Sequence, residues 1–228
     1  MTERRGERLL DLVAVMDRLR SPGGCPWDAQ QTHESLVEYL VEEAYETVEA
    51  IETADDAALR EELGDLLLQV VFHARIAEER AEPWSIDDVA AGIVDKLVSR
   101  HPHVFGDVDA ATAEEVEANW SALKAAEKGR ESVTDGVPQA LPALVLAAKL
   151  LSRSKALGLP ATDAAAAQAA EQAVAAVTDG APSEDDYGRL LLALVAQARR
   201  DGVDAEQALR SAVRTYRASV RSAEGLPG

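Results

Sequence analysis

The stretch LVEYLVEEAYETVEAIETADDAALREELGDLLLQVV, residues 36–71, decides the fold of this chain. Apolar residues recur every three or four positions on both sides of its centre, which is the spacing of an amphipathic helix. We therefore expect one helix over residues 34–53 and a second over residues 56–80. Because only a few residues (54–56) connect them, these two helices should form an antiparallel hairpin.

The same helical spacing continues along most of the 228 residues, and no convincing alternating strand pattern interrupts it. Ala and Leu dominate the composition, while aromatic residues make up 4%, which favours helices packed on helices. We therefore expect an all-α fold, a bundle of helices. The further helices are expected over residues 6–20, 85–101, 112–128, 139–157, 162–178, 184–200 and 204–222.

Part of this helical pattern occurs twice. Residues 62–75 read ELGDLLLQVVFHAR and residues 186–199 read DYGRLLLALVAQAR. We interpret the match as tandem helical units, although chance similarity between two helices rich in Ala and Leu is the alternative. A polar stretch with Gly and Pro at residues 129–138 would link the halves, giving domains of residues 1–130 and 131–228.

Composition limits the partners and the compartment. The formal net charge is −18, so nucleic acid is not expected to bind, because no basic stripe is present to displace its counterions. An anionic small molecule could bind if a cation or a local basic cluster neutralised it. Cys25 is the only cysteine, which fits a reducing compartment. Without a signal-peptide pattern or a membrane-length apolar run, we expect a cytoplasmic protein that does not bind membranes.

Two acidic pairs stand on the predicted hairpin. Residues 42–46 follow the pattern E-E-x-x-E, and residues 62–65 follow the pattern E-x-x-D. Positions three apart lie about 60° apart around a helix, so each pair projects from one side of its helix. Counted from the connection, the two pairs lie at similar heights. Four carboxylates should therefore converge at the margin of the apolar interface, those of Glu43, Glu46, Glu62 and Asp65.

Converging carboxylates need a counter-charge. Two of them about 4 Å apart repel by roughly 4 kcal/mol at an effective dielectric near 20, so such a site takes up protons or binds a cation. All-oxygen ligands suit Mg²⁺ or Mn²⁺. A di-iron centre would instead need Glu-x-x-His on paired helices. Solvated acidic helix faces without any metal are the alternative, and spacing alone does not decide between the two interpretations.

With its surroundings, the acidic pattern resembles the all-α nucleoside triphosphate pyrophosphohydrolases, and specifically the MazG type. The resemblance covers roughly residues 8–222, and its combined motifs are highly specific. Three further stretches are similar to MazG signatures: CPWD at 25–28 with QTH at 31–33, the run from Asp95 to Phe105, and Trp120 with Lys124, Glu127 and Lys128.

The resemblance implies magnesium-dependent hydrolysis of nucleoside triphosphates between the α and β phosphates. The products would be the nucleoside monophosphate and pyrophosphate, and the reaction would cleanse the nucleotide pool. It also implies a homodimer or a multiple of one. One alternative is a related enzyme restricted to a single substrate such as dUTP, dCTP or phosphoribosyl-ATP. Another is a non-enzymatic helical dimer that binds a nucleotide or a protein as a regulator.

By position, the resemblance implies metal ligation by Glu43, Glu46, Glu62 and Asp65. Glu42 or Glu43 would position or deprotonate the attacking water. Lys96 and Arg100, on one helix face by their spacing, match phosphate-contacting positions. Trp27 could stack on a nucleobase or serve only as a packing anchor. The remaining candidate substrate contacts, each with an ordinary structural alternative, are His101 and Lys124.

The second half of the chain departs from this pattern. Residues 171–175 read EQAVA where E-E-x-x-E would stand, and the counterpart of E-x-x-D runs from Asp186 to Arg189. Thr215 and Ser219 stand where the two basic residues would be. We therefore expect the second half to be a non-catalytic, structural or dimer-supporting copy.

Overall fold

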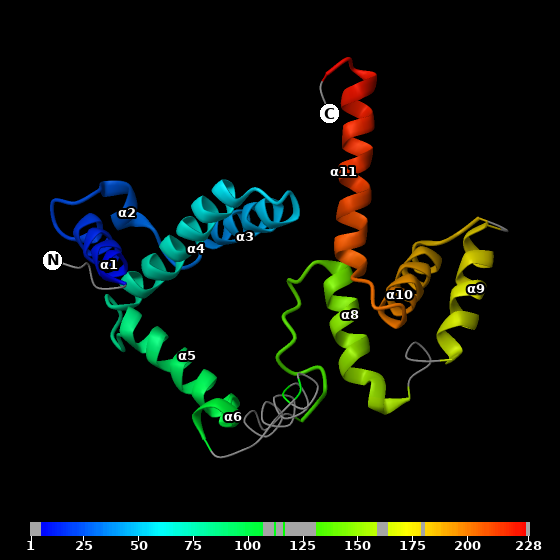
Figure 1. The fold of residues 1–228 in the computed structure, drawn as a ribbon, viewed down its shortest axis with the longest axis horizontal. Coiled ribbons are helices and arrows are strands. Elements are labelled where there is room, and N and C mark those ends of the chain that lie inside the picture. The colour runs from blue at the N-terminus through cyan, green and yellow to red at the C-terminus, as the bar shows by residue number, and fades with distance from the viewer. Residues whose placement is uncertain are drawn as a thin grey trace. The chain divides into compact units, whose positions relative to one another are not determined.

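The structure is a computed structural model, and it describes residues 6–106, 112, 116, 131–158, 164–178 and 181–226 (Figure 1). The described residues form helices and turns with no strand among them, which confirms the all-α fold. The chain divides into two compact units, Met1–Lys124 and Ala125–Gly228. Most of the helix expected over residues 112–128 lies outside the described residues, as do Trp120, Lys124 and Lys128.

The helices of the first unit are α1 (Glu7–Arg20), α2 (Pro26–Gln30), α3 (Val37–Glu52), α4 (Asp56–Ala77), α5 (Ile86–Arg100) and α6 (Pro102–Phe105). The longer helices match the predicted ranges to within a few residues. The two short helices, α2 and α6, were not predicted, because five and four residues are too few to show a helical period. Both begin with proline, whose missing N–H is harmless in a first turn.

A tight connection makes α3 and α4 packed neighbours (Figure 1). Ala54 adopts the left-handed conformation, with φ of 56°. Asp55 then caps α4, because its carboxylate accepts hydrogen bonds from the backbone N–H groups of Ala57 and Ala58 at 3.1 and 3.0 Å. Such a cap stabilises a helix by about 1 kcal/mol and fixes where α4 begins. The hairpin predicted from residues 36–71 is therefore present.

The main core of the first unit lies around the C-terminal part of α4. Its buried residues come from α1, from the start of α3 and from α4, and they are Met16, Leu36, Val71, Phe72 and Ile76. Fully burying a side chain of this kind contributes roughly 1.5–3 kcal/mol. Helix α1 packs on α4, so the hairpin is held firmly at the end away from its turn.

The other side of the hairpin exposes apolar residues. On α3 the exposed fractions reach 58% at Ile51, and on α4 they reach 52% at Leu63. The side of α3 that packs on α4 instead carries buried Thr47 and Ala50. We call the exposed set the apolar stripe, and its members are Leu40, Val41, Tyr45, Ile51, Leu63, Leu67 and Val70.

The second unit contains α8 (Ala143–Ser154), a 3₁₀ turn (Lys155–Leu157), α9 (Ala164–Thr178), α10 (Glu184–Arg200) and α11 (Ala205–Ala223). Helix α10 packs on α8, α9 and α11. Helix α8 begins later than predicted, because Pro142 stands at its N-cap. Within the part of the chain that the structure describes, no helix combines the length and the apolar character needed to cross a membrane.

Candidate metal centre

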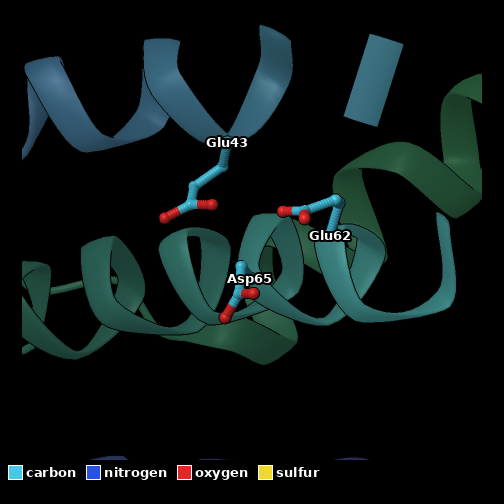
Figure 2. Close-up of side chains that lie close together, drawn as sticks. All are labelled: Glu43, Glu62 and Asp65. Atoms are coloured by element: carbon cyan, nitrogen blue, oxygen red, sulfur yellow. The ribbon is translucent and has the colours of Figure 1, made fainter. Parts of the chain in front are cut away.

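Three of the four predicted metal ligands come together between α3 and α4. They are Glu43 of α3 and Glu62 and Asp65 of α4, and one carboxylate oxygen of each lies within 4.8 Å of those of the other two. Figure 2 shows the Glu43 side chain reaching from α3 toward α4, with the Glu62 carboxylate turned toward it. The antiparallel hairpin and the i, i+3 spacing on α4 produce this arrangement.

The carboxylates of this cluster repel one another. The pKa of Glu43 is raised, first by its partial burial and then by the negative charges of Asp65, Glu46 and Glu62. The pKa of Glu62 is also raised, first by desolvation and then by Glu46 and Asp65. Within the described part of the chain, all the charges that act on Glu43 are negative, so the cluster is suited to receive a cation.

Glu46 and Glu42 lie beside the cluster. Glu46 stands outside the group of three, yet its charge raises the pKa of both Glu43 and Glu62. Glu42 is exposed and acts more weakly on Glu43. Carboxylate oxygens are the ligands that Mg²⁺ and Mn²⁺ prefer, and a half-exposed site leaves room for the waters that Mg²⁺ retains. The residues present therefore fit a hard divalent cation.

The two basic candidates on α5 differ in exposure. Lys96 is exposed, whereas Arg100 is only 4% exposed. The i, i+4 spacing predicted one shared helix face, but it gave no sign of this difference. Arg100 is the last residue of α5, and α6 follows at once and packs on α5.

His101 is the C-cap residue of α5, and its Nδ1 lies 2.6 Å from the backbone oxygen of Leu97. The ring of His103 lies beside it, with the two ring centroids 5.5 Å apart. The structure thus shows His101 in contact with its own helix end. The Nδ1 atom of His103 is buried and has no hydrogen-bond partner among the described residues.

The structure contains a histidine pair that the sequence did not predict. The Nδ1 atoms of His33 and His73 are 2.8 Å apart, and their rings are stacked with centroids 5.1 Å apart. Trp84 stacks on His33 in turn, at 6.3 Å between centroids. The QTH motif contains His33, but no local pattern points to a partner 40 residues away.

Comparison with known proteins agrees with this geometry. The MazG nucleotide pyrophosphohydrolase domain model matches residues 31–105, which include α3 to α6. An uncharacterized 26.1 kDa protein in the blaB 3′ region of Streptomyces cacaoi is 54% identical over 96% of this chain and 84% of its own length.

Two further relatives carry functional names. The nucleoside triphosphate pyrophosphohydrolase/pyrophosphatase MazG of Thermotoga maritima is 40% identical over 90% of this chain and 81% of its own length. The nucleoside triphosphate pyrophosphohydrolase of Escherichia coli is 41% identical over 94% of this chain and 86% of its own length. These matches confirm the resemblance found in the sequence, and the chain belongs to the MazG family of nucleotide pyrophosphohydrolases.

Proposed function

We propose that this protein hydrolyses nucleoside triphosphates between the α and β phosphates, releasing the monophosphate and pyrophosphate. The observation that carries the proposal is the convergence of Glu43, Glu62 and Asp65 oxygens within 4.8 Å, with no compensating charge among the groups that act on Glu43. The names of the Thermotoga maritima and Escherichia coli relatives support this reaction.

In this proposal, Mg²⁺ is the resident cation, with Mn²⁺ as a substitute, and Glu43, Glu46, Glu62 and Asp65 hold it. When bound, the ion would stabilise negative charge on the phosphoryl oxygens and lower the pKa of a water molecule. Glu42 or Glu43 orients that water and accepts its proton. Lys96, which is exposed on α5, and Arg100 contact the phosphates. The other assigned substrate contacts are Trp27, His101 and Lys124.

A second copy of the chain covers the apolar stripe in this proposal. The exposed apolar residues of the stripe come from both helices of the hairpin, and contiguous exposed apolar patches mark interaction surfaces. A two-fold dimer uses the same patch on both copies, which suits a continuous stripe. Catalysis belongs to residues 1–130, and residues 131–228 form the non-catalytic half.

The most direct experiment measures pyrophosphate release from a panel of nucleoside triphosphates, with and without Mg²⁺. We expect monophosphate and pyrophosphate in equal amounts, and only when the cation is present. Preference for one nucleotide by several orders of magnitude would identify the restricted enzyme. Nucleotide binding without turnover of any triphosphate, with either Mg²⁺ or Mn²⁺, would favour the regulator and overturn the proposal.

A further inference from the structure

Thr47, on the side of α3 that packs on α4, has a buried hydroxyl group. The residue is 7% exposed, and its Oγ1 has no hydrogen-bond partner among the described residues. A buried polar atom that has lost its contact with water and gained no partner destabilises the fold. Because most buried polar side chains are paired, an unpaired one indicates that a further arrangement of the site gives it a partner.

Other threonines of this chain use their hydroxyl groups differently. A threonine in a helix can donate to the backbone oxygen four residues earlier. Three threonines within helices or at a helix end do so, at 2.8, 3.0 and 3.1 Å respectively, and they are Thr53, Thr178 and Thr215. Thr47 makes no such bond to the oxygen of Glu43. Its hydroxyl group can therefore donate to another acceptor.

The hairpin places Thr47 at the height of a predicted metal ligand. Thr47 stands seven residues before Ala54, and Glu62 stands eight residues after it. With a rise of about 1.5 Å per residue, the two residues lie at nearly the same height on antiparallel helices. Thr47 is buried on the side of α3 that packs on α4. Figure 2 shows the Glu62 carboxylate turned toward Glu43, which stands one turn before Thr47 on α3.

The chemistry of a carboxylate ligand calls for a donor of this kind. One carboxylate oxygen of Glu62 belongs to the group of three within 4.8 Å, and the second oxygen can accept a hydrogen bond. Such a bond fixes the direction of a ligand and raises the affinity for the metal. A hydroxyl group is a neutral donor, so it holds the carboxylate without competing with a cation, as a positive side chain would.

The backbone of the hairpin does not have to move for this contact. The cap of Asp55 fixes the start of α4, and the ion pair of Arg20 with Glu79, at 2.8 Å, ties the chain after its end to α1. Rotation of the Glu62 side chain is the only change required, because Thr47 already lies in the interface between the two helices.

We propose that Thr47 is a positioning residue, whose hydroxyl group donates to the Glu62 carboxylate when a divalent cation occupies the acidic cluster. This inference rests on the proposed function and adds a residue that lies outside the E-E-x-x-E and E-x-x-D patterns. Thr47 touches neither the cation nor the substrate, and it acts by fixing the direction of one ligand.

The test uses two substitutions in the full chain, with Mg²⁺ or Mn²⁺ as the only ligand and at fixed ionic strength. Thr47→Val keeps the branched shape and removes the hydroxyl group, whereas Thr47→Ser keeps the hydroxyl group and removes a methyl group. We expect Thr47→Val to raise Kd for the cation, measured by isothermal titration calorimetry, about tenfold. Thr47→Ser should change Kd by less than about threefold.

The melting temperature without cation separates positioning from packing. Thr47→Val should melt at the same temperature as the unmodified protein or roughly 1–3 °C higher, because a buried, unpaired polar atom is gone. Thr47→Ser should melt roughly 2–4 °C lower, because a buried methyl group is lost. The more stable variant should therefore bind the cation more weakly, an inversion that a merely structural role does not produce.

Thr53→Val is the matched control, because it removes a hydroxyl group that donates to the backbone of the same helix. Its Kd for the cation should equal that of the unmodified protein. An unchanged Kd in Thr47→Val, or an equal rise in Thr47→Val and Thr47→Ser, would overturn the inference.

Failure of the proposed function would be visible in the unmodified protein, as the absence of both cation binding and pyrophosphate release, and it would overturn the inference as well. If the unmodified protein binds the cation and releases pyrophosphate while Thr47→Val keeps its Kd, only the role of Thr47 is wrong.

Discussion

The two helical hairpins, α3–α4 and α9–α10, shift the pKa of the acid at the same position in opposite directions. In the first, Glu62 has a raised pKa, because it is desolvated and lies beside other carboxylates. In the second, the matching Asp186 has its pKa lowered to about 2, first by the Ser183 side chain and also by Arg189. Asp186 completes a capping box with Ser183 at the start of α10, and Arg189 lies 2.6 Å from its carboxylate.

This difference shows that a hairpin of this kind can pack without an acid at the position of Asp65. Helix α10 packs on α9 although an arginine stands at the position of Asp65. That arginine pairs with the neighbouring acids Asp185 and Asp186, so these acids of the second hairpin have a positive partner in the chain itself. The first hairpin leaves its carboxylates facing one another. Their arrangement raises the energy of the metal-free fold, and the proposed cation would relieve that repulsion.

The largest expected effect comes from giving the first hairpin the residue that the second hairpin has at the position matching Asp65. Asp65→Arg should reduce metal-dependent pyrophosphate release by at least about a thousandfold, because it replaces a ligand with a positive charge that pairs with Glu62. Glu49→Arg is the matched control, since Glu49 is an exposed acid on a different side of α3. The control should keep most of the activity. Full activity in Asp65→Arg would show that the cluster is not the metal site.

The second prediction concerns the apolar stripe that α3 and α4 leave open. Leu63→Glu places a charge within the stripe and should convert the proposed dimer into a monomer, halving the mass measured by sedimentation. Leu10→Glu is the control, because Leu10 is 68% exposed on α1, outside the stripe. If the unmodified protein is already monomeric at micromolar concentration, the stripe is not a dimer interface.

The acidic cluster could be predicted because it depends on local rules. The 3.6-residue period places Glu62 and Asp65 on one side of α4, and the short connection brings α3 alongside. Asp55 then sets the first residue of α4 through its cap. Each of these signals is contained in fewer than about 30 consecutive residues. The family resemblance supplied the chemistry that spacing alone left undecided.

The other contacts could not be predicted, because they join residues far apart in the sequence. Arg20 and Glu79 are 59 positions apart, and His33 and His73 are 40 apart. The 4% exposure of Arg100 does not follow from the i, i+4 spacing, which places this residue only on the same helix face as Lys96. Tertiary contacts of this kind are chosen by shape and hydrogen bonding in the folded chain, so a single sequence does not show them.

The third prediction removes an acid beside the cluster without adding a charge. Glu46→Ala should abolish turnover, and it should abolish the rise in melting temperature that we expect Mg²⁺ to give the unmodified protein. The melting temperature of the metal-free variant should be equal or higher by roughly 1–4 °C, because a charge that acts on both Glu43 and Glu62 is gone. A clear loss of stability without metal would mean that Glu46 is structural.

The smallest effect concerns the histidine pair, for which the second hairpin has no counterpart, because Gln197 stands at the position that matches His73. The pKa of His73 is lowered, first by burial and then by the charge of His33. The folded protein therefore resists protonation near the ordinary value of 6.5, whereas the unfolded chain accepts the proton. As the pH falls below about 6.5, the unfolded state binds more protons and the free energy of unfolding decreases.

His73→Gln gives the first hairpin the residue that the second hairpin has at the matching position. It should remove the part of the acid-induced decrease in the free energy of unfolding that comes from His73. We expect the fall in melting temperature between about pH 7.5 and 5.5 to shrink by roughly one or two degrees in the metal-free protein. His101→Gln leaves the His33–His73 pair intact and serves as the control, so its profile should follow that of the unmodified chain. If the melting temperature of His73→Gln fell with pH as steeply as that of the unmodified chain, the His33–His73 pair would be solvated enough to accept a second proton without loss of stability. In that case its role would be limited to stacking between Trp84 and α4.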